Sequence, residues 1–177
     1  KMTKFILHGG YTRIENEDNK NFFKEVTKNA KQILCIYFAR EKKEWKEAFD
    51  DDKKRINFKN LILANEEDIE RQIKEADAIW IRGGDTNILK EKLSNINFKE
   101  LIEGKTIAGS SAGVYILVKY YFSNNKKLIG EGFGILNIKA FCHYTEKDRK
   151  NLEKLKQHKE RLETIILPDS KYVVLEI

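Results

Sequence analysis

A short apolar segment, Thr106–Ala108, runs directly into the sequence Gly-Ser-Ser-Ala-Gly at residues 109–113. A Gly-x-Ser-x-Gly turn constrains the fold, because it stops a strand abruptly, starts a helix at once and exposes the central serine at the helix N-terminus. Side chains at positions 109 and 113 would collide with the neighbouring strand and helix, and glycine relieves the strain of the turn. We therefore predict that Ser111 is a nucleophile. The alternative is a glycine-serine turn that only caps a helix.

Strand-like and helix-like segments alternate along the chain. The apolar runs that predict strands are Phe5–Leu7, Ile33–Phe38, Leu61–Leu63, 78–82, 106–108 and a closing pair at Ile165–Leu167 and Tyr172–Leu175. The helices expected between them lie near 19–31, 41–49, from 65, at 88–93, after 111 and over 145–163. This alternation predicts one α/β domain over residues 1–177, with a mostly parallel sheet and helices on both faces. Ligands bind at the carboxyl ends of such strands, where Gly9-Gly10, Gly83-Gly84 and Ser111 fall.

A second glycine motif follows the predicted strand at 78–82. The strand continues into Gly83-Gly84-Asp85-Thr86, where Asp85 or Thr86 can cap the next helix. Two glycines at a helix start leave backbone N–H groups free to point at an anion. Gly83 and Asp85 are therefore candidates for substrate binding.

Three histidines are candidates for the base that a serine nucleophile needs, because a serine hydroxyl is almost fully protonated at neutral pH. His143 follows the apolar run Leu136–Cys142 and is the best candidate. His8 follows the first strand and either lines the same cleft or forms a structural turn. His158 lies in a polar helix segment and is expected to be solvated. Cys142 is not expected to be the nucleophile, because strand neighbours point to opposite faces and it would not meet His143.

Together these motifs resemble the S51 serine peptidases, a family that includes aspartyl dipeptidase and cyanophycinase. Gly83–Thr86 matches the family's Gly-Gly-Asn/Asp-Thr, Gly109–Gly113 its Gly-x-Ser-Ala-Gly, and His143-Tyr144 its Pro-His-Tyr/Phe, in the family's order. The resemblance runs from about residue 4 to residue 174. It implies a flavodoxin-like sheet related to the class I glutamine amidotransferases.

The resemblance also implies roles for individual residues. Ser111 would be the nucleophile and His143 the base, and the N–H groups of Gly84 and Ala112 would form an oxyanion hole. The substrate would be a small peptide, and a homodimer is suggested.

The acid of the triad is left open between two residues. Aspartyl dipeptidase takes an aspartate from between the serine and the histidine, but residues 112–142 contain only one carboxylate, Glu131. Cyanophycinase takes its acid from a later strand end, which matches Asp169 here, and we prefer Asp169 to Glu131. Cys142 replaces the family's proline. By the same resemblance Arg149 would recognise an acidic substrate side chain, the alternative being an ordinary solvated helix residue.

Composition excludes several classes of partner. The chain has 34 basic and 28 acidic residues, and they are interleaved, as in Glu41–Glu47. We expect solvated helix faces and no nucleic-acid partner. No run approaches the ~20 apolar residues of a membrane span, so no membrane partner is expected. The two cysteines and three histidines lack metal-ligand spacing, so neither a metal nor a cofactor is predicted, and a cytoplasmic, reduced protein is the simplest inference.

The sequence thus predicts a serine hydrolase that cleaves an amide bond in a small peptide, with an Asp-X dipeptide as the specific candidate, through an acyl-enzyme on Ser111. One alternative is a catalytically silent amidotransferase-like domain that binds a ligand or partner. Another is an α/β-hydrolase esterase, in which the order serine, acid, histidine would require Glu131. Known family members are longer, so this is either a compact member or one without the family's C-terminal end.

Overall fold

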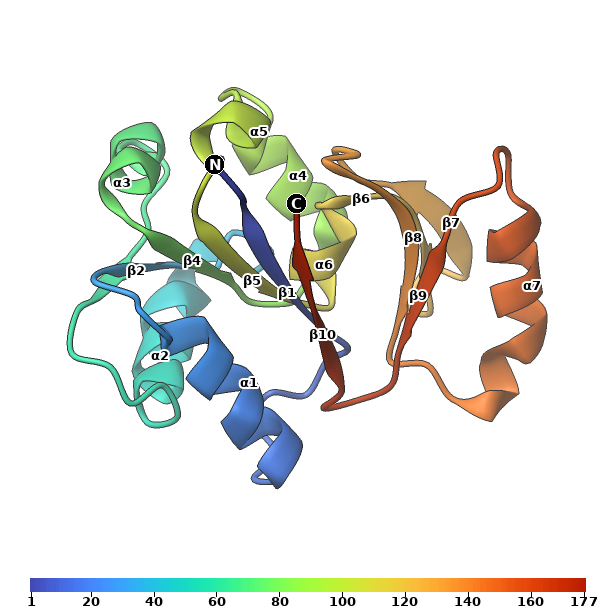
Figure 1. Ribbon diagram of the computed structural model, residues 1–177, viewed down its shortest axis with the longest axis horizontal. Coiled ribbons are helices and arrows are strands. Elements are labelled where there is room, and N and C mark those ends of the chain that lie inside the picture. Colours follow the sequence, from blue (N-terminus) through green and yellow to red (C-terminus); the bar gives the residue numbers. More distant parts are fainter.

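Six strands form the larger sheet of the computed structural model, which describes residues 1–177 (Figure 1). They are β1 (Lys4–His8), β2 (Ile33–Ile36), β3 (Leu61–Leu63), β4 (Ala78–Ile81), β5 (Thr106–Ser110) and β10 (Tyr172–Glu176). Their order is β10-β1-β5-β4-β2-β3, and only β10 is antiparallel to its neighbour. The predicted α/β fold with a mostly parallel sheet is confirmed.

Helices cover both faces of this sheet. Figure 1 shows α1 and α2 on one side and α3, α4 and α5 on the other. The bounds are α1 (Glu17–Thr27), α2 (Lys42–Lys53), α3 (Ile69–Glu75), α4 (Thr86–Leu93), α5 (Phe98–Leu101) and the single turn α6 (Ala112–Tyr115). Every residue of β2 and β4 is buried, which explains why both strands are continuous apolar runs.

A second sheet, which the sequence did not predict as such, follows α6. Its order is β7-β6-β8-β9, with β6 (Val118–Ser123), β7 (Leu128–Glu131), β8 (Leu136–Cys142) and β9 (Thr164–Leu167). The 3₁₀ turn Glu146–Asp148 and α7 (Arg149–Gln157) follow β8, and Figure 1 shows α7 on the outer side of this sheet. Phe122 and Phe141 pack there with Leu152 and Leu155.

Two expectations from the sequence are corrected by this second sheet. The helix predicted over 145–163 is shorter, because α7 ends at Gln157. The closing strands do not pair with each other: β9 joins β8 in the second sheet, and β10 joins β1 in the first. The chain therefore crosses from one sheet to the other at Pro168–Lys171, directly beside the candidate site.

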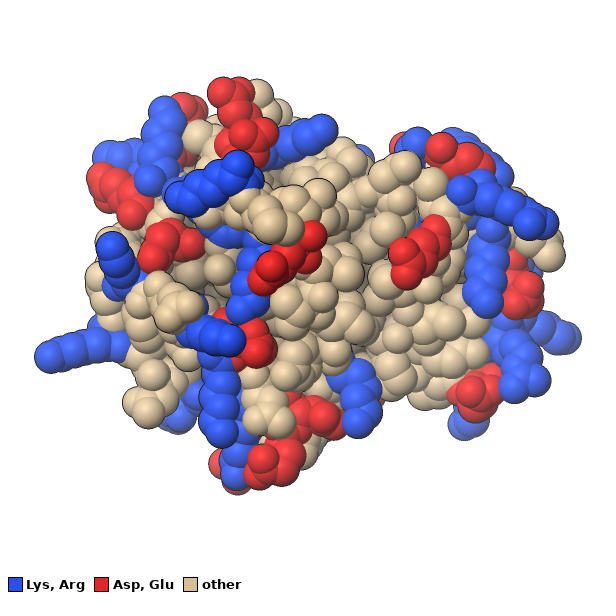
Figure 2. Space-filling view, in the orientation of Figure 1, with Lys and Arg blue, Asp and Glu red and all other residues tan.

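Charged side chains are dispersed on the face drawn in Figure 2. Basic and acidic residues are interspersed along its margins, and fewer lie over the middle of the face. The edge strands β9 and β10 carry the exposed Ile166 and Val174. None of the helices combines the length and the apolar composition needed to cross a lipid bilayer.

A buried carboxylate ties α2 to the sheet. Asp52 is fully buried and accepts hydrogen bonds from the Tyr37 hydroxyl (2.8 Å), Trp80 Nε1 (2.8 Å) and Arg82 Nη1 (3.1 Å). Burial raises the pKa of Asp52, and the nearby Arg82 guanidinium opposes that shift. The Arg82 side chain is itself only 8% exposed, so each charge depends on the other.

Asp52→Asn should lower the free energy of unfolding by roughly 3–5 kcal/mol, because it leaves the buried Arg82 charge without its main partner. Asp50→Asn on the same helix is the control, since Asp50 contacts only exposed lysines. Urea denaturation followed by tryptophan fluorescence measures both. Equal stability of the two variants would contradict the role given to Asp52.

Candidate active site

Ser111 sits in a strained turn between β5 and α6. Its backbone has φ 54° and ψ −108°, values that a non-glycine residue adopts only when its surroundings enforce them. A Cβ at position 109 would lie 2.4 Å from the carbonyl oxygen of Gly113, and one at position 113 would lie 2.2 Å from that of Ile81. Glycines at both positions therefore allow β4, β5 and α6 to approach closely enough to hold this turn.

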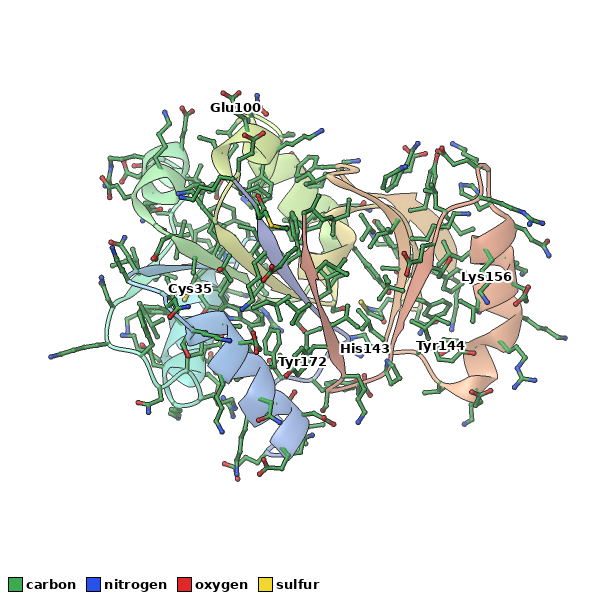
Figure 3. All side chains as sticks on the ribbon, in the orientation of Figure 1. Cys35, Glu100, His143, Tyr144, Lys156 and Tyr172 are labelled. Carbon is green, nitrogen blue, oxygen red and sulfur yellow. The ribbon has the colours of Figure 1, made fainter.

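His143 and Asp169 complete a line of hydrogen bonds that starts at Ser111. His143 Nε2 lies 3.2 Å from Ser111 Oγ, and His143 Nδ1 lies 2.6 Å from Asp169 Oδ1. Figure 3 shows His143 at the end of the strands where the two sheets meet, with Tyr144 nearer to α7. A carboxylate at Nδ1 fixes the proton there, so Nε2 is left to accept the serine proton.

The loop between β1 and α1 holds the His143 ring. The His143 backbone N–H donates to the Gly9 carbonyl at 2.9 Å. A Cβ at Gly10 would lie 1.9 Å from His143 Cε1, so the ring packs directly on this glycine. The Tyr11 ring meets the imidazole edge-on, with centroids 4.9 Å apart. The ring is therefore fixed by packing as well as by Asp169.

His8 belongs to a buried network behind this loop. Its Nδ1 accepts the Gly10 N–H at 2.9 Å, so the ring proton is on Nε2, which donates to Asn19 Oδ1 at 2.7 Å. Asn19 and Asn16 in turn donate to the Ser170 hydroxyl, next to Asp169. Burial lowers the pKa of His8 to about 4. His8 is therefore neutral and supports the loop through these hydrogen bonds. Nothing in the sequence pattern alone indicated its asparagine and serine partners.

The Gly83-Gly84 segment lies against the serine turn. A Cβ at Gly83 would lie 3.2 Å from Ser111 Cβ, and Gly84 has φ 152° with the Ala39 carbonyl 2.4 Å from where its Cβ would be. Neither the Gly84 N–H nor the Ala112 N–H donates a hydrogen bond within the protein. Both donors are therefore free for a ligand beside Ser111.

Asp85 is the N-cap of α4. One of its carboxylate oxygens accepts from the backbone N–H groups of Asn87 (2.8 Å) and Ile88 (3.2 Å). Its other oxygen lies 3.6 Å from Lys126 Nζ. Asp85 borders the same cavity as Ser111 while it caps the helix.

The cavity beside Ser111 and His143 has a volume of about 650 Å³. One wall is the β6–β7 turn, which includes Asn124 and Lys126, and another carries the three arginines Arg13, Arg40 and Arg82. The lining is mostly polar. No group of three or more His, Cys, Asp or Glu side chains is arranged to hold a metal ion.

Two candidate residues from the sequence lie elsewhere. Glu131 is at the end of β7, where its carboxylate pairs with Lys159 at 3.0 Å, so it does not contact His143. Arg149 starts α7 and pairs with Glu146 at 2.7 Å, with both side chains at least three-quarters exposed. It does not line the cavity. The cause in both cases is that the second sheet carries these segments away from Ser111.

Cys142 is a structural residue beside the site. It is buried, its backbone N–H donates to the Tyr115 hydroxyl at 2.9 Å, and its Sγ lies about 4 Å from backbone carbonyls. Burial raises the pKa of its thiol strongly. A thiol held in the protonated form is a poor nucleophile, in agreement with the expectation from the sequence.

The buried His8 should make stability depend on pH. Its pKa is 6.5 in the unfolded chain and about 4 in the folded one, so below pH 6.5 the unfolded state binds a proton that the folded state does not. Stability should therefore fall by about 3 kcal/mol as the pH drops from 6.5 to 4. His8→Gln should show a flatter slope in urea denaturation over this range.

Above pH 7, His8 is neutral in both states, so the difference in stability between wild type and His8→Gln should be constant there. If the free energy of unfolding of His8→Gln fell between pH 6.5 and 4 as steeply as that of the wild type, this would contradict the assignment of His8 as a buried, neutral histidine.

Comparisons with known proteins identify the family and the fold of the chain. The model of peptidase family S51 matches residues 5–176. No curated protein matches the chain. Among solved structures, a peptidase from an acI-B1 Actinobacterium superposes with a TM-score of 0.73 at 20% identity, over 98% of this chain and 83% of that one. A protein assigned as a peptidase E from Listeria monocytogenes EGD-e superposes with a TM-score of 0.65 at 18% identity, over 100% and 98%.

The two structures share the fold, and the family model covers almost the whole chain, including the glycine, serine and histidine motifs around the cavity. The chain belongs to peptidase family S51.

Proposed function

We propose that this S51 peptidase hydrolyses an amide bond in a small peptide through an acyl-enzyme on Ser111. The observation that carries the proposal is the line from Ser111 Oγ to His143 Nε2 (3.2 Å) and from His143 Nδ1 to Asp169 Oδ1 (2.6 Å). The same geometry supports Asp169, and not Glu131, as the orienting acid. A cavity of about 650 Å³ suits a short peptide.

Each step of the reaction has a residue beside it. As Ser111 Oγ attacks the scissile carbonyl, His143 Nε2 takes the hydroxyl proton, and Asp169 stabilises the resulting imidazolium. The N–H groups of Gly84 and Ala112 are free to stabilise the negative oxygen of the tetrahedral intermediate. His143 then protonates the leaving amine. A water molecule, deprotonated by His143, hydrolyses the acyl-enzyme and regenerates the serine.

The order of the residues along the chain argues against an α/β-hydrolase esterase. In that fold the acid comes between the serine and the histidine. Here Asp169 follows His143, and Glu131, the one carboxylate between Ser111 and His143, pairs with Lys159.

Ser111→Ala should lower kcat for dipeptide hydrolysis by about 10⁶-fold, the scale seen when a triad serine is removed. The thermal midpoint should stay close to that of the wild type, because alanine occupies the same backbone position without a new contact. Ser110→Ala is the matched control and should retain activity, since its hydroxyl faces His8 at 3.1 Å. Full turnover by Ser111→Ala would place the nucleophile elsewhere.

Asp169→Asn and Glu131→Gln should separate the two candidate acids. Asp169→Asn should lower kcat by roughly 10⁴-fold, because an amide no longer fixes the imidazole tautomer. Glu131→Gln should leave kcat within a few-fold of the wild type, because that carboxylate makes a surface ion pair. Steady-state kinetics on one dipeptide measures both variants. The reverse order of effects would refute the assignment of Asp169.

A further inference from the structure

The three arginines of the cavity wall differ in what neutralises them. Arg82 is bonded to Asp52 at 3.1 Å and to the Ala48 carbonyl at 3.1 Å. Arg13 pairs with Asp51 at 3.2 Å. Both charges are therefore already matched by carboxylates of α2.

Arg40 is matched less closely than the other two arginines. Its side chain is only 34% exposed, yet its guanidinium forms no hydrogen bond, and its Nε is buried without any partner. Its ion pair with Glu44 is long, at 3.8 Å, and both side chains of that pair are partly exposed. Burial lowers the pKa of Arg40, and the neighbouring Arg82 lowers it further. A partly buried guanidinium that receives no hydrogen-bond acceptor from the protein is unfavourable, so this arrangement is suited to an anion that enters the cavity.

Arg40 and Ser111 lie close enough for one short peptide to contact both. It follows β2, and the sheet order places β4 between β2 and β5, so the strands that lead to Arg40 and Ser111 are about 10 Å apart. The preceding residue, Ala39, accepts the Asp85 N–H at 2.8 Å and packs against Gly84. An extended peptide advances about 3.4 Å per residue, so a carboxylate one or two residues from the scissile bond covers about 3–7 Å of this distance. The long Arg40 side chain, which lines the same cavity as Ser111, covers the rest.

We propose that Arg40 binds a carboxylate of the substrate and so determines specificity for the peptide. This inference rests on the proposed function, because it concerns the same cavity. The carboxylate is either the free C-terminus of a dipeptide or an acidic side chain. The planar guanidinium can hold either one with two parallel hydrogen bonds, a geometry that lysine does not reproduce.

Four peptides distinguish the two sources: Asp-Leu, Asn-Leu, Asp-leucinamide and Asn-leucinamide. For the wild type and Arg40→Gln, kcat/KM is measured on each. We expect Arg40→Gln to lose roughly 30-fold or more on peptides that carry the recognised carboxylate and less than about 3-fold on those that lack it. Loss confined to the two free acids identifies the C-terminus, and loss confined to the two Asp peptides identifies the side chain.

Two further variants keep the test specific. Arg40→Lys should lose less kcat/KM than Arg40→Gln but should not reach the wild type. Lysine restores the positive charge but not the planar guanidinium that makes two parallel hydrogen bonds. Arg71→Gln, an exposed arginine paired with Glu75 on α3, should behave as the wild type on all four peptides. The thermal midpoint of Arg40→Gln should equal or exceed that of the wild type, since no hydrogen bond of the protein is lost. A lowered midpoint with equal loss on all four peptides would show a structural role and overturn the proposal.

Binding tests the proposal independently of turnover. Titration calorimetry of the four peptides into Ser111→Ala and into Ser111→Ala with Arg40→Gln should show the same selective loss in affinity. If the wild type cleaves none of the peptides while this selectivity is present, the proposed hydrolysis fails and the carboxylate site stands. Equal affinities of both proteins for all four peptides, or a selective loss from Arg149→Gln in place of Arg40→Gln, would overturn the assignment of Arg40.

Discussion

The close approach of β4, β5 and α6 is the constraint on which the site depends. It exists only because positions 109 and 113 carry no side chain, and it forces Ser111 into a backbone conformation with φ 54°. The N-terminus of the helix that follows leaves the Ala112 N–H free beside the serine hydroxyl. The strain of this turn is retained because β4 is fully buried, and β1 and β5 are buried at every residue except their first, so the surroundings cannot relax.

The second sheet positions the residues that act on that serine. His143 leaves the end of β8, and Asp169 lies on the crossing from β9 to β10, so both approach Ser111 from the far side of the cleft. The loop after β1 joins the two parts, because Gly9 and Gly10 contact the histidine while Gly10 accepts the Ser170 N–H. The neutral His8 supports that loop by accepting the Gly10 N–H, and its burial lowers its pKa.

The sequence was sufficient for the parallel sheet and for the strand ends where glycines and the serine meet, since apolar runs and glycine turns are local signals. The second sheet was missed because the apolar stretch after Gly113 has no period that separates strand from helix. Strand pairing determines that this stretch is a strand, because β6 lies between β7 and β8, which come later in the chain. Glu131 and Asp169 could not be separated for the same reason, since only the tertiary crossing brings one of them to His143. Arg40 gave no sequence signal, because the absence of hydrogen bonds to its guanidinium is visible only in three dimensions.

The central claim is that Ser111, activated by His143, is the reacting group, and mapping of a covalent label tests it most directly. The protein is treated with a fluorophosphonate, digested with trypsin and analysed by fragmentation mass spectrometry of the peptide 106–119, which contains both serines of the turn. We predict one phosphonyl group per chain, on Ser111, and slower labelling when His143 is replaced by alanine. Labelling on Ser110 or outside this peptide, or a rate that does not depend on His143, would contradict it.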